Sequence, residues 1–219
     1  MTHSLDTLTK ALLRAAEKAG ADSADAMAVR GSSVSVDVRG GALEQAERSE
    51  GVDIGLRVFI GKRSANVSAS DTSDITIEEM AIRAIAMAKE APEDPYSGLA
   101  DPDQLATQWD VAKLELCDPA PEPTPETLQD DAARAEAASL AIKGVTQVQS
   151  ASAGYGAQQV FLAASNGFEG GYHRTDRGLS CVAIAGAGSG MERDYDGDSR
   201  IFQADLRSAE DIGTSAGTR

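Results

Sequence analysis

The placement of proline limits most strongly how this chain can fold. All seven prolines of the 219-residue sequence lie between positions 92 and 125. Proline fixes φ and lacks the backbone N–H that helices and central strands use, so this segment forms neither element as a regular run. We therefore predict an extended connector over residues 91–125 between two structured halves. The prolines are Pro92, Pro95, Pro102, Pro119, Pro121, Pro123 and Pro125.

The connector also holds much of the negative charge. Residues 92–126 contain nine acidic residues and one lysine, within a chain of net charge −15 and pI near 4.5. Because binding to a phosphate backbone depends on many Lys and Arg contacts, we expect no direct contact with nucleic acid. Trp109 is the only tryptophan, and it predicts that residues 105–116 dock on a structured half.

The first half, residues 1–90, shows helix, antiparallel meander and helix in that order. Ser4 begins a helix that Gly20 ends, and Thr76 with Glu79 match the capping box of a second helix. Between the helices, apolar and polar residues alternate as in strands with one buried face. The strands are predicted near 34–38, 52–60 and 65–69, with hairpin turns at Gly40–Gly41 and Gly61–Lys62. The second helix presents an apolar stripe of Ile77, Met80, Ala81, Ala84, Ile85 and Ala88.

The second half, residues 126–207, repeats this order. Thr124 caps a helix in which Pro125 takes the first position, and Gly144 ends it. The inner face of this helix is predicted to be Leu128, Ala132, Ala135 and Ile142. Strand-like segments follow near 145–153, 158–164, 168–175, 179–187, 190–195 and 199–205, with a type I′ turn at Asn166–Gly167. The predicted fold is α+β, with two helix–antiparallel-meander–helix halves joined by the Pro-rich acidic connector.

Residues 208–219 predict the start of a last helix at Ser208. A helix of about three turns that contains two glycines needs packing against another element. Either this tail is disordered, or it leads into a C-terminal domain that lies outside this sequence, which is what we expect.

The cysteines and the first residues indicate the compartment. Cys117 and Cys181 form neither a CxxC pair nor a zinc-type spacing, and they are interpreted as reduced thiols. The start of the chain has neither the basic nor the apolar region of a signal peptide. No stretch approaches the roughly 18 apolar residues of a spanning helix. We expect a cytoplasmic protein.

Two motifs allow a ligand-binding interpretation beside a structural one. Asp194-Tyr-Asp196-Gly-Asp198 is similar to the start of a calcium loop, but Ser199 stands where that loop needs glycine, and both flanks look like strands. We favour a solvated hairpin turn and keep a metal site as the alternative. Gly186-Ala-Gly188-Ser-Gly190 lacks the following helix and the GK[ST] of a phosphate loop, which favours relaxed strand ends.

No catalytic residue is predicted. His3 and His173 are the only histidines; His3 lies in a terminus expected to fray, and a structural or solvent-facing role is favoured for His173. HExxH, HExxxH and G-x-S-x-G motifs do not occur in the sequence. A His-based zinc site therefore cannot be assembled from this sequence alone.

Three basic side chains lie on the hairpin predicted over residues 51–63, namely Arg57, Lys62 and Arg63. An ordinary hairpin directs such charges into solvent. The functional alternative is a hairpin that receives a partner or an extended peptide along its edge. We take these three residues as the predicted contact site.

Two segments of the first half, VDVRGGALE at residues 36–44 and EGVDIGLRVFIGKR at residues 50–63, resemble the N-terminal domain of the TldD/PmbA family. AEKAGADSAD at residues 16–25 is similar to the end of that family's first helix, and DPYSGL at residues 94–99 is similar to the segment after its second helix. The match is closer to the PmbA (TldE) branch than to TldD. It extends over essentially the whole chain, with its specific motifs in residues 12–100.

This resemblance implies a heterodimeric cytosolic peptidase in which the TldD subunit bears zinc and the TldE/PmbA subunit lacks it. The family is associated with maturation of a peptide antibiotic, degradation of an antitoxin and modulation of DNA gyrase. TldD members carry HExxxH and a further metal ligand in their C-terminal half, and this sequence contains neither. No catalytic residue is therefore carried over, and zinc is expected only in a TldD-like partner.

We accordingly predict the N-terminal domain of a PmbA/TldE-like, metal-lacking subunit of a TldD/TldE-type metallopeptidase complex. Its expected role in peptide maturation or proteolysis is assembly with the TldD-like subunit and shaping the path of an unfolded peptide substrate, with no membrane contact. One alternative is a stand-alone protein- or peptide-binding module without a peptidase role. Another is a calcium-binding module that uses Asp194, Asp196 and Asp198.

Overall fold

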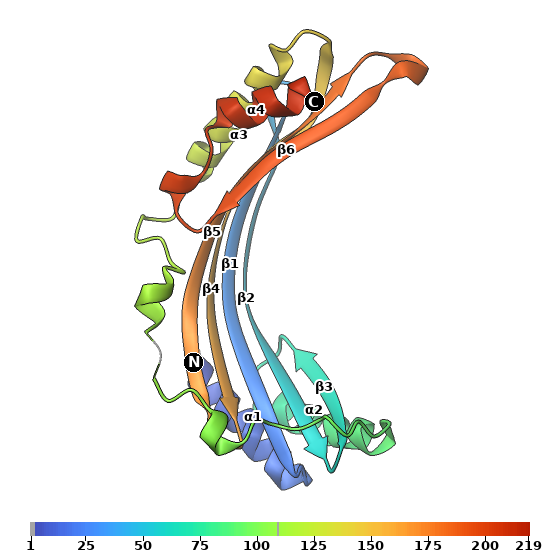
Figure 1. The fold of residues 1–219 in the computed structure, drawn as a ribbon, viewed down its shortest axis with the longest axis vertical. Helices are drawn as coiled ribbons and strands as arrows, with labels where there is room; N and C mark the ends of the chain where they lie inside the picture. The colour runs from blue at the N-terminus through green and yellow to red at the C-terminus, as the bar shows by residue number, and fades with distance from the viewer. Residues whose placement is uncertain (1–2, 109) are drawn as a thin grey trace. The chain divides into compact units, whose positions relative to one another are not determined.

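The computed structural model describes residues 3–108 and 110–219. Its described part forms four α-helices and one six-stranded sheet of order β3-β2-β1-β4-β5-β6, which confirms the α+β class (Figure 1). The helices are α1 (Leu5–Ala19), α2 (Asp74–Glu90), α3 (Pro125–Leu140) and α4 (Ala209–Thr218). The strands are β1 (Ser23–Arg39), β2 (Ala42–Ile60), β3 (Arg63–Ala69), β4 (Val145–Ala164), β5 (Glu169–Ala185) and β6 (Glu192–Arg200).

The sheet consists of two meanders in chain order, β1 to β3 and β4 to β6, in which β1 and β4 are neighbours. The chain divides into two compact units that do not follow the linear sequence. Unit 1 comprises the chain up to Gly31 together with Gly51–Leu114 and Gln158–His173, and unit 2 comprises Ser32–Glu50, Glu115–Ala157 and Arg174–Arg219. Strands β1, β2, β4 and β5 thus contribute residues to both units. The boundaries predicted at 1–90, 91–125, 126–207 and 208–219 stay predictions.

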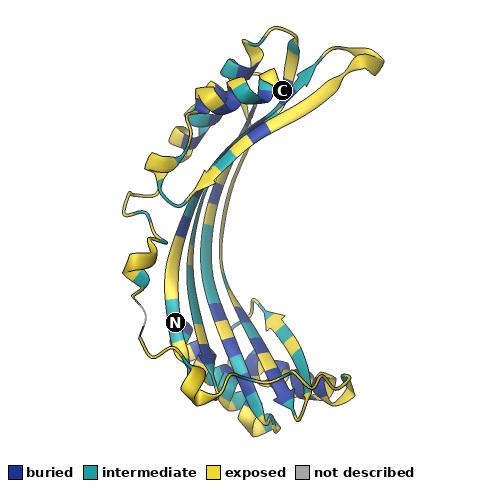
Figure 2. Cartoon of the chain, viewed as in Figure 1, coloured by how far each residue is buried: buried dark blue, intermediate teal, exposed yellow. Residues whose placement is uncertain are grey.

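In unit 1, α1 and α2 contact each other, and their apolar faces bury alternate residues of β1 and β2 (Figure 2). The stripe predicted for α2 is buried as expected. The helix begins earlier than predicted, because Ser73 rather than Thr76 is its N-cap and its hydroxyl accepts a hydrogen bond from the Thr76 N–H at 3.3 Å. The core of this unit comprises Leu5, Leu8, Leu12, Ala16, Ala24, Ala26, Ala28, Ile54, Leu56, Val58, Ile77, Met80, Ala81, Ala84, Ile85 and Ala88.

In unit 2, α3 and α4 pack together, and α4 also contacts β6. Thr124 caps α3 and Ser208 caps α4 through hydroxyls that accept backbone N–H groups, as predicted. Leu128, Ala132 and Ala135 are buried as expected, whereas Ile142 lies beyond the end of α3. The core comprises Val34, Val36, Val38, Leu128, Ala132, Ala135, Val148, Ala151, Ala153, Leu179, Cys181, Ala183, Ala209, Ile212 and Ala216.

The second meander has fewer and longer strands than predicted. The segments expected at 145–153 and 158–164 are one strand, β4, and those at 168–175 and 179–187 are one strand, β5. Only Ser199 and Arg200 of the strand expected at 199–205 are extended as part of β6, and a 3₁₀ turn, Gln203–Asp205, follows. The glycines of 186–190 lie between the end of β5 and the start of β6, as predicted, and Gly188–Gly190 forms a 3₁₀ turn there.

The predicted hairpins are present between β1 and β2 and between β2 and β3. Gly40 and Gly41 both have positive φ, 63° and 74°, as a type I′ turn requires. The Glu136 carboxylate of α3 accepts both of their N–H groups, at 2.6 and 2.8 Å. The turn at Asn166–Gly167 is not type I′, because only Gly167 has positive φ there.

The connector is anchored at several points by backbone hydrogen bonds. In unit 1, the Asp94 N–H donates to the Lys62 carbonyl at 2.8 Å. In unit 2, the Thr175 N–H donates to the Leu116 carbonyl at 2.9 Å, and the Asp118 N–H donates to the Thr175 hydroxyl at 2.8 Å. Trp109, on which the docking prediction for 105–116 depends, lies outside the described residues.

Candidate functional site

A shallow groove of about 370 Å³ lies over the three strands of the first meander. It is on the face opposite α1 and α2, because Asp25 and Met27 of β1 and Gly55 and Arg57 of β2 alternate with buried residues of those strands. Gly55 leaves the floor of the groove without a side chain. The space above it is open, because a Cβ added there would meet only the Met27 and Val67 carbonyl oxygens, at 4.0 Å. The lining residues are Asp25, Met27, Gly55, Leu56, Arg57, Asn66, Val67 and Ser68.

Arg57 of β2 is the cation of this groove. Its Nε donates to Asp25 Oδ2 on β1 at 2.9 Å, its Nη2 also bonds Asp25, and its guanidinium carbon lies 5.1 Å from the centroid of the Phe59 ring. The Asp25 side chain is 16% exposed and that of Arg57 is 46% exposed. The pair therefore fixes the guanidinium while it leaves one edge open to solvent. Such a group can donate hydrogen bonds to a carbonyl or carboxylate in the groove.

The structure does not bring the other two predicted residues into the groove. Lys62 Nζ donates to the Ser97 carbonyl at 3.1 Å. Arg63 Nη1 donates to the Lys89 carbonyl in the last turn of α2 at 2.6 Å. A cation at this end of a helix interacts favourably with the negative end of the helix dipole. Both side chains hold the segment after α2 against the β2–β3 turn. A partner contact for Lys62 and Arg63 stays a prediction.

Sequence reasoning missed the residues that surround Arg57. Asn66 and Ser68 of β3 lie opposite Arg57 and Gly55 in the antiparallel register, so their side chains share the face of the groove. The alternation of Ala65, Val67 and Ala69 with polar residues contained this signal. Asp25 gave no such signal, because its strand was not predicted.

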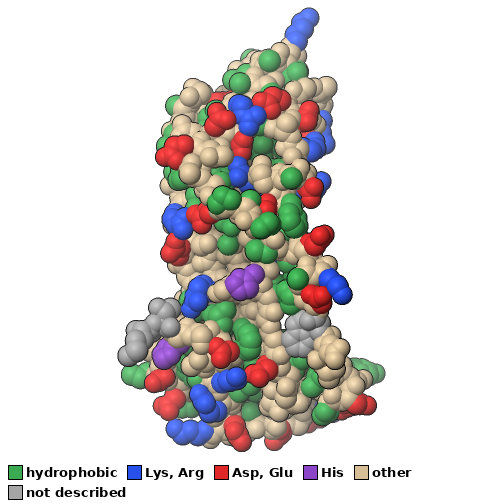
Figure 3. All heavy atoms as spheres, turned by 90° about the vertical axis from the view of Figure 1, so that its left-hand side faces the viewer, with side chains coloured by type: hydrophobic (Ala, Val, Ile, Leu, Met, Phe, Trp, Pro, Cys, Tyr) green, Lys and Arg blue, Asp and Glu red, His purple; other side chains and the backbone are tan. Residues whose placement is uncertain are grey.

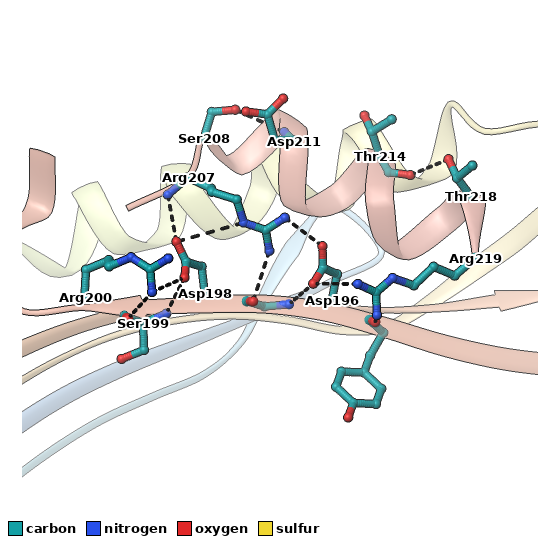
Figure 4. Close-up of polar contacts among 12 residues, drawn as sticks. Asp196, Asp198, Ser199, Arg200, Arg207, Ser208, Asp211, Thr214, Thr218 and Arg219 are labelled. Atoms are coloured by element: carbon teal, nitrogen blue, oxygen red, sulfur yellow. Dashed lines mark hydrogen bonds and ion pairs between the residues drawn. The ribbon is translucent and has the colours of Figure 1, made fainter. Parts of the chain in front are cut away.

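The acidic motif 194–198 is part of a strand, which corrects the predicted hairpin turn. Asp196 is 6% exposed, and its carboxylate accepts from Arg207 Nη1 at 2.9 Å and Arg219 Nη2 at 3.4 Å (Figure 4). The hydrogen bond from Arg207 holds the pKa of Asp196 well below its usual range. Asp198 is also paired, with Arg200 at 2.7 Å. These carboxylates attach the end of the chain to β6.

Two family models match the chain. The first, described as PmbA/TldA metallopeptidase domain 1, matches residues 24–88, and the second, the PmbA/TldA metallopeptidase central domain, matches residues 118–219. The chain belongs to the PmbA/TldD family. This family member is 32% identical to Metalloprotease PmbA of Escherichia coli O157:H7 over 90% of its own length and 44% of the relative's. It is 30% identical to the Metalloprotease PmbA homolog of Haemophilus influenzae over 83% of its length and 40% of the relative's.

Solved structures share the fold of this PmbA/TldD-family chain. A candidate modulator of DNA gyrase from Bacteroides thetaiotaomicron superposes with a TM-score of 0.85 at 21% identity, covering 96% of this chain and 48% of that one. TldE from Thermococcus kodakarensis superposes with a TM-score of 0.74 at 18% identity, covering 96% and 46%. The chain thus spans less than half the length of the relatives it matches.

The described residues of this PmbA/TldD-family chain do not fit a metal site. Within 3–108 and 110–219, no group of three or more His, Cys, Asp or Glu side chains is arranged to hold an ion. Asp196 and Asp198, the carboxylates of the calcium alternative, are engaged by arginines. The Nε2 atom of His173 on β5 lies 2.9 Å from the Nε2 atom of the Gln159 side chain, on an exposed part of the sheet. Among the described residues, no helix is long and apolar enough to cross a membrane.

Proposed function

We propose that this chain is the N-terminal part of a metal-lacking, PmbA/TldE-type subunit that assembles with a TldD-type subunit and guides an unfolded peptide. Membership of the PmbA/TldD metallopeptidase family supports the assignment to peptide maturation or proteolysis. In this proposal, zinc belongs to the TldD-type partner. Its two free cysteines are compatible with the reducing cytoplasm, which is the proposed location.

The groove at Arg57 is the observation that carries the peptide-guiding role. An extended peptide presents alternating N–H and C=O groups, and the groove offers a guanidinium, the amide of Asn66 and the hydroxyl of Ser68 above a glycine floor. Met27, 45% exposed, supplies an adaptable apolar contact that accepts different side chains. This chemistry fits an extended backbone better than a small molecule with a defined shape.

A nucleic-acid substrate is not part of the proposal. The net charge is −15, and on the face drawn in Figure 3 basic side chains are interspersed with acidic ones. Phosphate binding would require a concentrated basic surface.

Peptide binding tests the groove directly. A fluorescein-labelled decapeptide of Ala, Gly and Ser is titrated into the 219-residue chain and followed by anisotropy and by amide shifts at Gly55, Asn66 and Ser68. Arg57→Ala is expected to weaken binding about tenfold or more, the value of roughly one hydrogen bond to a charged donor. Arg83→Ala, an exposed arginine of α2, is the matched control. Equal binding by the wild type and Arg57→Ala would remove Arg57 from the site.

Partner assembly is tested separately by sedimentation of the chain with a purified TldD-type subunit. A heteromer with increased peptidase activity on an unfolded protein substrate supports the proposal. A chain that binds the decapeptide and ignores the TldD-type subunit supports the stand-alone binding module instead.

A further inference from the structure

The two edges of the sheet differ in how their backbone groups are satisfied. β6 is the last strand on one side, so every second residue turns its N–H and C=O away from β5. The N–H groups of Tyr195, Gly197 and Ser199 donate to the carboxylates of the residues before them, at 2.7, 2.9 and 3.1 Å. Arg219 donates to the Tyr195 carbonyl at 3.3 Å, and Arg207 donates to the Gly197 carbonyl at 3.0 Å. This edge is closed by the chain's own side chains (Figure 4).

The other edge is open over part of its length. β3 pairs with β2 only from Ile54 to Ile60. Figure 1 shows β3 as a short strand beside one end of β2. On the side away from β1, Ala42–Glu50 therefore has no strand neighbour among the described residues. All nine residues of this segment are exposed. Within the described chain, no side chain bonds their backbone groups as the aspartates and arginines do along β6. We call the outer side of Ala42–Glu50 the β2 edge.

The side chains of the β2 edge restrict what can pair with it. The segment carries three glutamates and one arginine. Arg48 is occupied by Glu50, whose Oε1 lies 2.7 Å from Nη2, and by Glu122. Glu44 Oε1 lies 3.4 Å from Arg39 Nη1, so Glu47 is the glutamate of the segment that makes no ion pair among the described residues. A second copy of the chain would bring acid against acid, and like charges opposite each other destabilise a strand pair. An extended segment with Lys or Arg side chains would instead place opposite charges across the strand pair, which stabilises it.

We propose that the β2 edge accepts an extended, Lys- or Arg-bearing segment of a partner protein as an added β-strand. The main chain of the segment supplies the hydrogen bonds that the edge lacks. Its basic side chains pair with Glu47 and add to the arginine pairs that Glu44 and Glu50 already make. This surface belongs to unit 2 and is distinct from the groove of unit 1. The proposal therefore does not rest on peptide binding at Arg57.

Amide hydrogen exchange of the 219-residue chain with three synthetic peptides tests the proposal. The first is a nonapeptide of alternating Thr and Lys, the second replaces Lys with Glu, and the third is the Lys peptide N-methylated at alternate residues. The Lys peptide is expected to slow exchange at edge-facing amides of residues 42–50 and to bind at least about tenfold more tightly than the Glu peptide. The N-methylated peptide keeps the charge and loses strand donors, so it is expected to give no protection.

Charge reversal provides the complementary variant. Glu44→Lys with Glu47→Lys is expected to reverse the preference, so that the Glu peptide binds more tightly. Glu79→Lys with Glu90→Lys, on the exposed side of α2, is the matched control with the same change in net charge. Three outcomes would each overturn the proposal. The first is equal protection from amide exchange by the N-methylated peptide, and the second is protection only outside residues 42–50. The third is a concentration-dependent dimer that protects residues 42–50 without any peptide. The groove assay reads different amides, so the two tests fail independently.

Discussion

Aspartate occupies alternate positions of the edge strand β6, at Asp194, Asp196 and Asp198. Aspartate is depleted in strands because its carboxylate competes for nearby backbone groups. In β6 that competition is compatible with the strand, because the N–H groups of Tyr195, Gly197 and Ser199 have no strand neighbour to which they could donate, and they donate to the aspartates instead. The motif was predicted as a solvated turn, and the structure shows it as an edge strand whose outward N–H groups are bonded by its own carboxylates.

Asp196→Asn is expected to destabilise the chain by about 1–3 kcal/mol, because two arginines lose their charged acceptor. Urea unfolding at pH 7 measures the difference. Asp194→Asn is the control, since Asp194 is exposed and its carboxylate accepts only the Tyr195 N–H. Equal losses from the two variants would show that the arginine pairs contribute nothing.

The same carboxylate predicts a pH dependence. The pKa of Asp196 is lower in the folded chain than the value of about 3.9 for an unfolded one. Its contribution to stability is therefore complete above that value and is lost as the pH falls. The stability gap between wild type and Asp196→Asn is expected to narrow between pH 5 and pH 3 in urea titrations. A gap that stays constant would contradict this assignment.

The two thiols are expected to differ in reactivity. Cys117 is exposed, whereas Cys181 is fully buried in the core of unit 2, and burial raises its pKa. Ellman's reagent at pH 8 is expected to modify one thiol per native chain and two after unfolding, because the thiolate is the reactive form. Fast modification of two thiols in the native chain would place Cys181 at the surface.

Among the elements, α4 depends on its two glycines, although glycine has a low helix propensity. Gly213 lies so close to α3 that a Cβ there would overlap the Ala135 carbonyl oxygen. At Gly217 a Cβ would lie 3.0 Å from the Ser139 carbonyl oxygen. The same residues that weaken the isolated helix allow the close approach of α3 and α4 that stabilises it.

Gly213→Ala is expected to cost about 3 kcal/mol or more, because the backbone of α3 cannot move aside as a flexible side chain could. Thermal unfolding followed by circular dichroism measures the loss. Gly190→Ala is the control, since a Cβ there would enter open space and the φ of Gly190 lies outside the left-handed region. A neutral Gly213→Ala would mean that α3 and α4 are not packed at this distance.

Elements with strong apolar contrast could be predicted from the sequence, and the others could not. The stripe of α2 and the cap of α3 stand out because large apolar residues and Thr124–Pro125 are unambiguous signals. The start of β1 was missed because its buried residues there are alanines, and Ala42–Glu50 of β2 was missed because none of its residues is buried. Arg57 could be selected from the hairpin, but its partner Asp25 required the register of the sheet.

At the scale of the whole molecule, compact units and sequence order do not coincide. Phe161 packs against the core of unit 1, and the Ser165 N–H donates to the Ala24 carbonyl at 2.8 Å. The Ala24 N–H donates in return to the Ser165 hydroxyl at 3.0 Å. Residues near 160 therefore complete a core that begins near residue 5.

The isolated segment 1–90 is accordingly expected not to fold cooperatively, because the strand portion 158–173 that covers its core is missing. Proton–nitrogen correlation spectra and urea unfolding of the segment test this. The same segment mixed with a peptide of residues 145–173 is the control and is expected to gain dispersed signals. A cooperative transition of 1–90 alone would show that the first half is an independent domain.

The partnership of Ala24 with Ser165 also has a consequence in time. The two residues are 141 positions apart, and a ribosome adds about 5–20 residues per second. Ser165 is therefore made roughly 7–28 s after Ala24. Throughout that interval α1 and β1 exist as nascent chain without this neighbour, so residues that are made early reach their final state only after Ser165 has been made.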